Sequence, residues 1–204
     1  MTTKEFVTLE KRLLPALSGL AIKGRLMFIP PVDHTLRGFN FEPSGFDKRG
    51  IYVTAFFLPL CVPRTHISYE FGRRLKGTGW RADAPDLEAT LTEAMRKETP
   101  FLCSLRTVQD VVNAVMPFAE NARDPYAHEA IAYMLVRCGN TNDALTAVGQ
   151  LLASLDLAIP WQHEMAERAK SLKSQLLADP AAAQRQLDAW ESETVKNLGL
   201  EEFR

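Results

Sequence analysis

The stretch GIYVTAFFLPL, at positions 50–60, is the part of the sequence that most directly decides the fold. In an extended chain successive side chains point to opposite faces, so a half-buried strand alternates apolar and polar residues. Here both sets of alternating positions are mainly apolar, and Thr54 is the only short polar residue. Such a run is typical of a strand that is covered on both faces. We therefore expect residues 50–60 to form the central strand of a sheet.

The flanking segments predict the rest of that sheet and a helix before it. Phe6, Leu9, Leu13 and Leu17 recur at helical spacing, which predicts a helix over 4–17 that Pro15 bends or ends. Short glycine- and proline-containing connections favour an antiparallel sheet of about four strands. We expect the first helix to cover one face and later helices the other. The other strands are expected in AIKGRLMFIPP (21–31), RGFNFEPSGF (37–46) and HISYEFGRRL (66–75).

The composition changes near Pro85, after which the pattern is helical to the last residue. Prolines at helix starts and glycines just past helix ends are strong boundary signals. They predict about six helices, one of which ends at Thr99-Pro100 and the next of which has a capping box from Thr107 to Asp110. The fold class is therefore α+β, with a sheet-containing region at 1–84 and an all-helical region at 85–204. The two form one compact unit or two closely attached lobes. The other boundary signals are Pro85, Pro125, Gly139, Pro160, Pro180 and Gly199.

A charge difference accompanies this change in composition. Residues 1–84 contain 13 Lys/Arg and 7 Asp/Glu, a net charge of +6, whereas residues 85–204 contain 11 and 18, a net charge of −7. Charge asymmetry between halves of a chain can indicate an interaction surface for a partner. It can equally reflect attraction between the two halves themselves.

One helical pair resembles a known repeat. Over about residues 126–156, Ala132, Gly139, Ala144 and Val148 match the small-residue and turn positions of a tetratricopeptide repeat, although Leu135 stands where that repeat has tyrosine. The resemblance implies two antiparallel helices. No second copy follows at the repeat period of about 34 residues, and repeat arrays need about three units to bury a continuous core. Two interpretations stay open: a hairpin that closes a core, or a concave surface that binds a peptide.

Sequence motifs for common chemistries are absent. HEMAE at 163–167 has Glu167 where a zinc-protease helix needs its second histidine, and there is no CxxC. There is no GxxxxGK[ST], GxGxxG or GxSxG either, and KGTGWR at 76–81 is read as a glycine turn. We therefore expect no metal and no cofactor. With only Cys61, Cys103 and Cys138 and no run of about 18 apolar residues, we expect a cytoplasmic protein without a membrane-spanning helix.

The strongest remaining feature is the basic cluster at 73–81, in FGRRLKGTGWR. Cations beside an aromatic side chain can bind phosphates and stack on bases, which makes the cluster the candidate anionic-ligand site. The alternative is that its arginines pair with the acidic helical half while the tryptophan fills a seam between layers. With a protein that is not basic overall, we expect nucleic-acid binding to be weak at physiological salt. The candidate residues are Arg73, Arg74, Lys76, Trp80 and Arg81.

Three functional hypotheses follow. The first is a non-enzymatic protein–protein interaction module, comparable in general character to bacterial immunity or adaptor proteins, with another protein as its partner; this comparison is by association only. The second is an enzyme with a site assembled between the two lobes, with His34 or His66 beside an acid or Cys61. The third is a weak nucleic-acid or anionic-ligand binder that uses the cluster at 73–81. Of these, the sequence favours the first.

Overall fold

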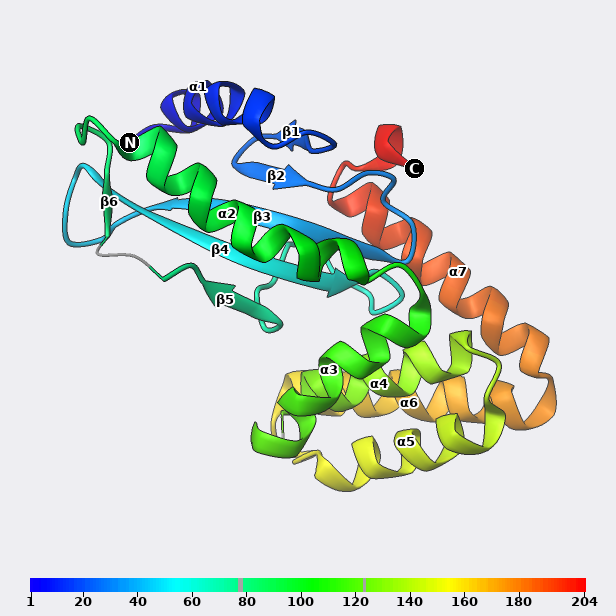
Figure 1. The fold of residues 1–204 in the computed structure, drawn as a ribbon. Coiled ribbons are helices and arrows are strands. Elements are labelled where there is room, and N and C mark those ends of the chain that lie inside the picture. Colours follow the sequence, from blue (N-terminus) through cyan, green and yellow to red (C-terminus); the bar gives the residue numbers. More distant parts are fainter. Residues whose placement is uncertain (77–78, 123) are drawn as a thin grey trace. The chain divides into compact units, whose positions relative to one another are not determined.

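The chain forms two compact units (Figure 1). The structure, a computed structural model, describes residues 1–76, 79–122 and 124–204. The first unit comprises residues 1–58, 68–104 and 203–204, and the second comprises residues 59–67 and 105–202. The protein is α+β, as predicted, with an N-terminal helix, an antiparallel sheet and six longer helices among the described residues.

The sheet lies in the first unit. Its hydrogen-bonded order is β1-β2-β3-β4-β5, and β6 also pairs with β4. The central position of β4 confirms the prediction from residues 50–60, and nearly all of its residues are buried. The strands are β1 (Ala21–Lys23), β2 (Leu26–Phe28), β3 (Thr35–Pro43), β4 (Gly50–Pro59), β5 (Gly72–Arg74) and β6 (Trp80–Arg81).

Two of the expected strands differ from the observed ones. Within the expected strand at 21–31, residues 21–28 form a hairpin, because Gly24 adopts a φ of +62° and returns the chain so that Ala21 faces Phe28. Of residues 66–75 only Gly72–Arg74 is a strand. The alternating aromatic residues before it have another use: the ring of Tyr69 packs edge-on against Phe56, with centroids 5.1 Å apart.

Two helices cover the same face of the sheet, so the expectation of one helical layer on each face is wrong for them. They are α1 (Thr3–Leu13), which a 3₁₀ turn containing Pro15 follows, and α2 (Leu87–Ser104), which runs across β3 and β4 (Figure 1). Both pack against alternating residues of one face of the sheet. The shared core includes Phe6, Leu9 and Leu13 of α1, Leu91, Met95 and Leu102 of α2, and Phe39, Phe41, Ile51, Val53 and Ala55 of the sheet.

The ends of α2 also differ from expectation. The helix begins at Leu87, two residues after Pro85, and it continues through Pro100 to Ser104. Proline removes one intrahelical hydrogen bond and normally ends or kinks a helix. Here Leu102 lies on the same apolar stripe as Leu91 and Met95 and is buried in the same core. That burial favours a further turn of helix beyond the proline.

The second unit contains five helices among its described residues. The prolines at 125, 160 and 180 begin helices as predicted. The predicted capping box is present: Thr107 Oγ1 accepts from the Asp110 amide at 3.1 Å, and the Asp110 carboxylate accepts from the Thr107 amide at 2.8 Å. The helices are α3 (Val108–Ala122), α4 (Pro125–Arg137), α5 (Thr141–Ser154), α6 (Pro160–Ala178) and α7 (Pro180–Asn197).

The predicted helical hairpin consists of α4 and α5. Gly139 has a φ of +75° just after α4, the left-handed conformation that favours glycine there. Ala132, Ala144 and Val148 are fully buried, so the small side chains allow a close approach of the helices. Whether the hairpin binds a peptide stays a prediction. In the described parts of the chain, no helix combines the length and apolar character needed to cross a membrane.

Candidate functional site

The basic cluster lies where the edge of the sheet is interrupted. Both β5 and β6 run antiparallel to β4 on its outer side, but their registers differ. Thr54 faces Arg74, and Ile51 faces Trp80. The two β4 residues are three positions apart in the sequence, whereas the residues that face them are six positions apart. The connection between β5 and β6 is therefore three residues longer than the stretch of β4 that it faces. Such insertions redirect side chains and are common beside functional sites.

The described ends of this insertion show how the chain leaves and rejoins the sheet. The Leu75 amide still donates to the Val53 carbonyl at 2.8 Å, so the β5 register is kept up to that residue. Gly79 then has a φ of +76°, which favours glycine immediately before β6. Gly77 and Thr78, which belong to the expected glycine turn at 76–81, lie outside the described residues.

A cleft of about 750 Å³ lies between this edge and α2, entirely within the first unit. We call it the basic cleft. All five residues of the predicted cluster line it, so the cleft brings together the whole candidate anionic-ligand site. The cleft is also lined by residues of α2 and the segment before it, including Asp86, Thr90, Glu93, Lys97 and Glu98.

Most cations of the basic cleft have carboxylate partners nearby. Arg73 pairs with Glu98 of α2, whose side chain is only 18% exposed. Lys97 pairs with Glu93 one helical turn away, with 2.7 Å between Nζ and Oε1. The pairing of Arg73 with Glu98 agrees with the alternative interpretation of the cluster, in which its arginines pair with acids of the helical half.

Arg81 pairs with acids of its own basic half, which the sequence did not indicate. Its guanidinium contacts Asp47 of the β3–β4 connection and Asp83, the latter at 3.1 Å from Nε to Oδ1. Asp83 also pairs with Arg49, with 2.6 Å between Arg49 Nη1 and Asp83 Oδ2. Hydrogen bonds from Arg49 and Arg81 lower the pKa of Asp83 to about 2. The hydrogen bond to Asp83 and the negative charges of Asp47 and Asp83 raise the pKa of Arg81. Asp83 and Arg81 therefore keep their charges throughout the neutral range.

The remaining residues of the cluster have other environments. The Arg74 guanidinium lies over the Tyr52 ring, 3.9 Å from its centroid, in a cation–π contact. Lys76 is exposed and has no ion pair with any residue that the structure describes. Trp80 is half-buried and packs against the core of the first unit, so part of its indole remains open to the cleft.

A second, smaller hollow of about 290 Å³ lies on the other side of β6. It is lined by the β3–β4 connection and the start of β4. Gly79, Trp80 and Arg81 line both hollows, so these two concave surfaces share β6. The β3–β4 connection was not predicted as part of a site, although its run PSGFDKRG, at 43–50, is rich in the residues that form turns.

The environments of possible catalytic groups differ from those of the basic cleft. Cys61 is fully buried, its Sγ lies 3.4 Å from the Met134 sulfur, and burial raises the pKa of its thiol to about 12. Such a thiol is protonated and inert at neutral pH. In the described residues, no three His, Cys, Asp or Glu side chains are grouped as a metal site would need.

The chain was compared with protein families, curated proteins and solved structures. No family model, no curated protein and no solved structure matches the chain.

Proposed function

We propose that the protein is a non-enzymatic protein–protein interaction module that binds a segment of another protein in the basic cleft. One observation carries this proposal: all five residues of the predicted cluster, together with the acids of α2, line a single cleft of about 750 Å³. Concave sites of this volume are common for ligands and peptide side chains. The three free cysteines, Cys61, Cys103 and Cys138, support a role in a reducing compartment such as the cytoplasm.

The mixed charge of the cleft favours a polypeptide over a nucleic acid. Nucleic-acid affinity grows with the number of phosphates that lysines and arginines neutralise. Arg73, Arg81 and Lys97 are already paired with carboxylates. A polypeptide presents apolar, polar and charged groups together, and this matches a half-buried indole among ion pairs.

A nucleic-acid or anionic-ligand function is the second candidate, and two residues favour it. Arg74 and Lys76 have no carboxylate contact in the described part of the molecule. Two such cations form a small electrostatic footprint, and binding through them would weaken steeply with salt.

The experiment is a pull-down of the tagged chain from nuclease-treated native lysate, comparing wild type with Lys76→Glu. Lys76 is exposed, so the charge reversal leaves the core intact. Lys11→Glu is the matched control, because Lys11 is also exposed but lies on α1 away from the cleft lining. We expect one protein to be retained by wild type and Lys11→Glu, and reduced by about tenfold with Lys76→Glu, which corresponds to ~1.4 kcal/mol.

Two other results would change the conclusion. Equal capture by wild type and Lys76→Glu would remove the cleft as the binding site. If the partner is captured only when the nuclease is omitted, and its capture falls from low to moderate salt, the ligand is a nucleic acid and not a protein.

A further inference from the structure

Phe46, in the connection between β3 and β4, is almost completely exposed. Its relative exposure is 99%, the highest among the large apolar residues of the described chain. A phenylalanine in this position gains none of the hydrophobic stabilisation that burial would provide in folding. Single exposed apolar residues are common on protein surfaces, so exposure alone assigns no role.

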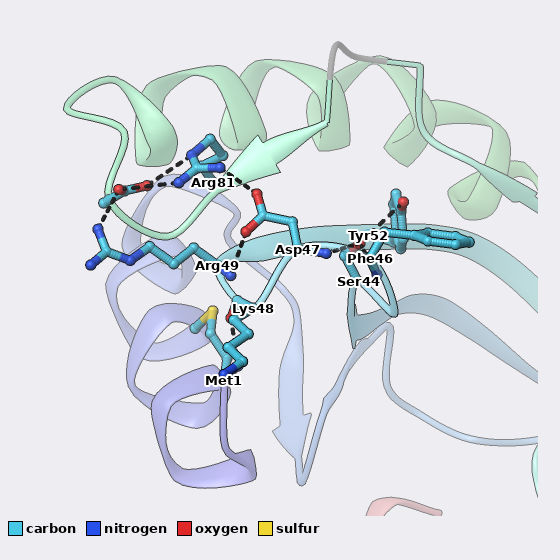
Figure 2. A network of polar contacts seen from close by, with 9 residues as sticks. Met1, Ser44, Phe46, Asp47, Lys48, Arg49, Tyr52 and Arg81 are labelled. Atoms are coloured by element: carbon cyan, nitrogen blue, oxygen red, sulfur yellow. Dashed lines mark hydrogen bonds and ion pairs between the residues drawn. The ribbon is translucent and has the colours of Figure 1, made fainter.

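The chain around Phe46 is held by an extensive set of polar contacts (Figure 2). Ser44 Oγ accepts hydrogen bonds from the amides of Phe46 and Asp47, each at 3.2 Å, and it lies 3.3 Å from the Tyr52 hydroxyl. Asp47 Oδ1 accepts from the Arg49 amide at 2.9 Å. The connection is therefore a structured turn, in which the backbone of Phe46 is fixed.

Contacts from outside the turn fix it further. Asp47 pairs with Arg81 of β6 (Figure 2). Arg49 pairs with Asp83. The amino group of Met1 donates to the Lys48 carbonyl at 3.3 Å. Fixing a side chain's backbone before binding lowers the conformational entropy that association costs. An exposed aromatic residue on such a support has the properties of an interface anchor.

This turn is continuous with the basic cleft. Asp47 lines the smaller hollow, and the Arg81 with which it pairs lines both hollows. A polypeptide that occupies the cleft and crosses β6 therefore arrives beside the turn. Lys48, two residues after Phe46, is exposed and has no ion pair with a described residue, which adds an available positive charge to the same turn.

We propose that Phe46 and Lys48 form a second contact with the same partner, in which Phe46 enters an apolar pocket bordered by carboxylates. This inference rests on the proposed function of the basic cleft. The continuity of the two hollows across β6 makes the contact part of one footprint, and the charge of Lys48 selects an acidic border. Phe46 and the cleft then act together, so that each strengthens binding at the other.

The test uses the full chain with the photoreactive residue p-benzoylphenylalanine at position 46, at position 76, or at position 11 as the control. We expect the protein captured through the cleft to be crosslinked from positions 46 and 76 and not from position 11. In a binding assay with that purified protein, Phe46→Ala should weaken affinity by about tenfold or more, as is typical of an aromatic anchor. Ser44→Ala, which keeps the ring but removes its support, should weaken affinity less.

The outcomes separate this inference from the proposed function. If Lys76→Glu abolishes binding while Phe46→Ala changes affinity less than about twofold, the cleft stands and the second contact is wrong. If neither variant affects binding, both proposals fail. Sedimentation of the chain with phosphatidylserine–phosphatidylcholine vesicles, lost in Phe46→Ala, would identify the turn as a membrane contact and overturn the protein pocket.

Discussion

The two units each bury a glutamate completely, but they accommodate it differently. Glu10 of α1 is 0% exposed, and neither of its carboxylate oxygens has a hydrogen-bond partner among the described residues. Glu129 of α4 is also 0% exposed, but its Oε1 lies 2.8 Å from a guanidinium nitrogen of Arg168 on α6. An unpaired buried carboxylate is costly when ionised, whereas a paired one depends on its partner.

The physical consequence is that the units are sensitive to different perturbations. Burial raises the pKa of Glu10 to about 8, and the charge of Arg25 offsets this only in part. Glu10 is therefore accommodated mainly by holding its proton. The stability of the first unit should depend on pH, and that of the second unit should depend on Arg168.

Removing the arginine partner should have the largest effect. Arg168→Met leaves Glu129 buried without a cation, a change that typically costs about 3–5 kcal/mol. Chemical denaturation, followed by circular dichroism, measures the loss as a fall in the free energy of unfolding. The double variant Arg168→Met/Glu129→Gln should recover part of it, because no buried charge then remains. A loss below about 1 kcal/mol in the single variant would mean that water reaches Glu129.

The pH dependence of Glu10 should be the next largest effect. Its folded-state pKa of about 8 lies above the ordinary value of 4.5, so its stabilising contribution is complete below pH 4.5 and is lost as pH rises through 8. At about 1.4 kcal/mol per pH unit the full loss has an upper limit of about 5 kcal/mol. Glu10→Gln should match wild type at pH 5 and be more stable at pH 9. Parallel pH profiles of the two proteins would contradict an ionisable buried Glu10.

Neutralising Glu129 while Arg168 remains should cost less than removing Arg168. The Arg168 side chain is 31% exposed, so its charge can turn toward water, whereas the carboxylate cannot. We expect Glu129→Gln to destabilise the protein by about 1.5–3 kcal/mol, the range for losing a hydrogen bond to a charged group. Differential scanning calorimetry beside Arg168→Met tests this order. Equal losses in the two variants would contradict the asymmetry between the buried and the exposed partner.

The buried position of Glu10 could have been predicted from the sequence, whereas the partner of Glu129 could not. Phe6, Leu9, Glu10 and Leu13 follow the i, i+3, i+4, i+7 pattern, so Glu10 occupies an apolar-stripe position. Arg168 lies 39 residues after Glu129, and only the packing of α4 against α6 brings the two together. Sequence spacing reports contacts within one element but does not report contacts between elements.

The basic cleft illustrates the same limit. The five cluster residues could be grouped because they are neighbours in the sequence, and the central strand and proline-led helices were predicted from local pattern. The acids Glu98 and Asp47 that pair with the cluster belong to α2 and to the β3–β4 turn. The three-residue insertion between β5 and β6 follows from pairing with β4, and no local pattern in 71–81 specifies that register.

The smallest expected effect is that of Arg25 on the pKa of Glu10. The positive charge of Arg25 opposes the rise in the Glu10 pKa, so Arg25→Ala should raise that pKa further. The pH above which the stability difference between Glu10 and Glu10→Gln stops growing should then move upward by less than about one unit. Lys11→Ala is a suitable control, because that exposed side chain neighbours Glu10 in sequence but does not contribute to its pKa shift. A downward shift in Arg25→Ala, or an equal shift in Lys11→Ala, would show that a general change in net charge, and not Arg25 itself, acts on the buried carboxyl.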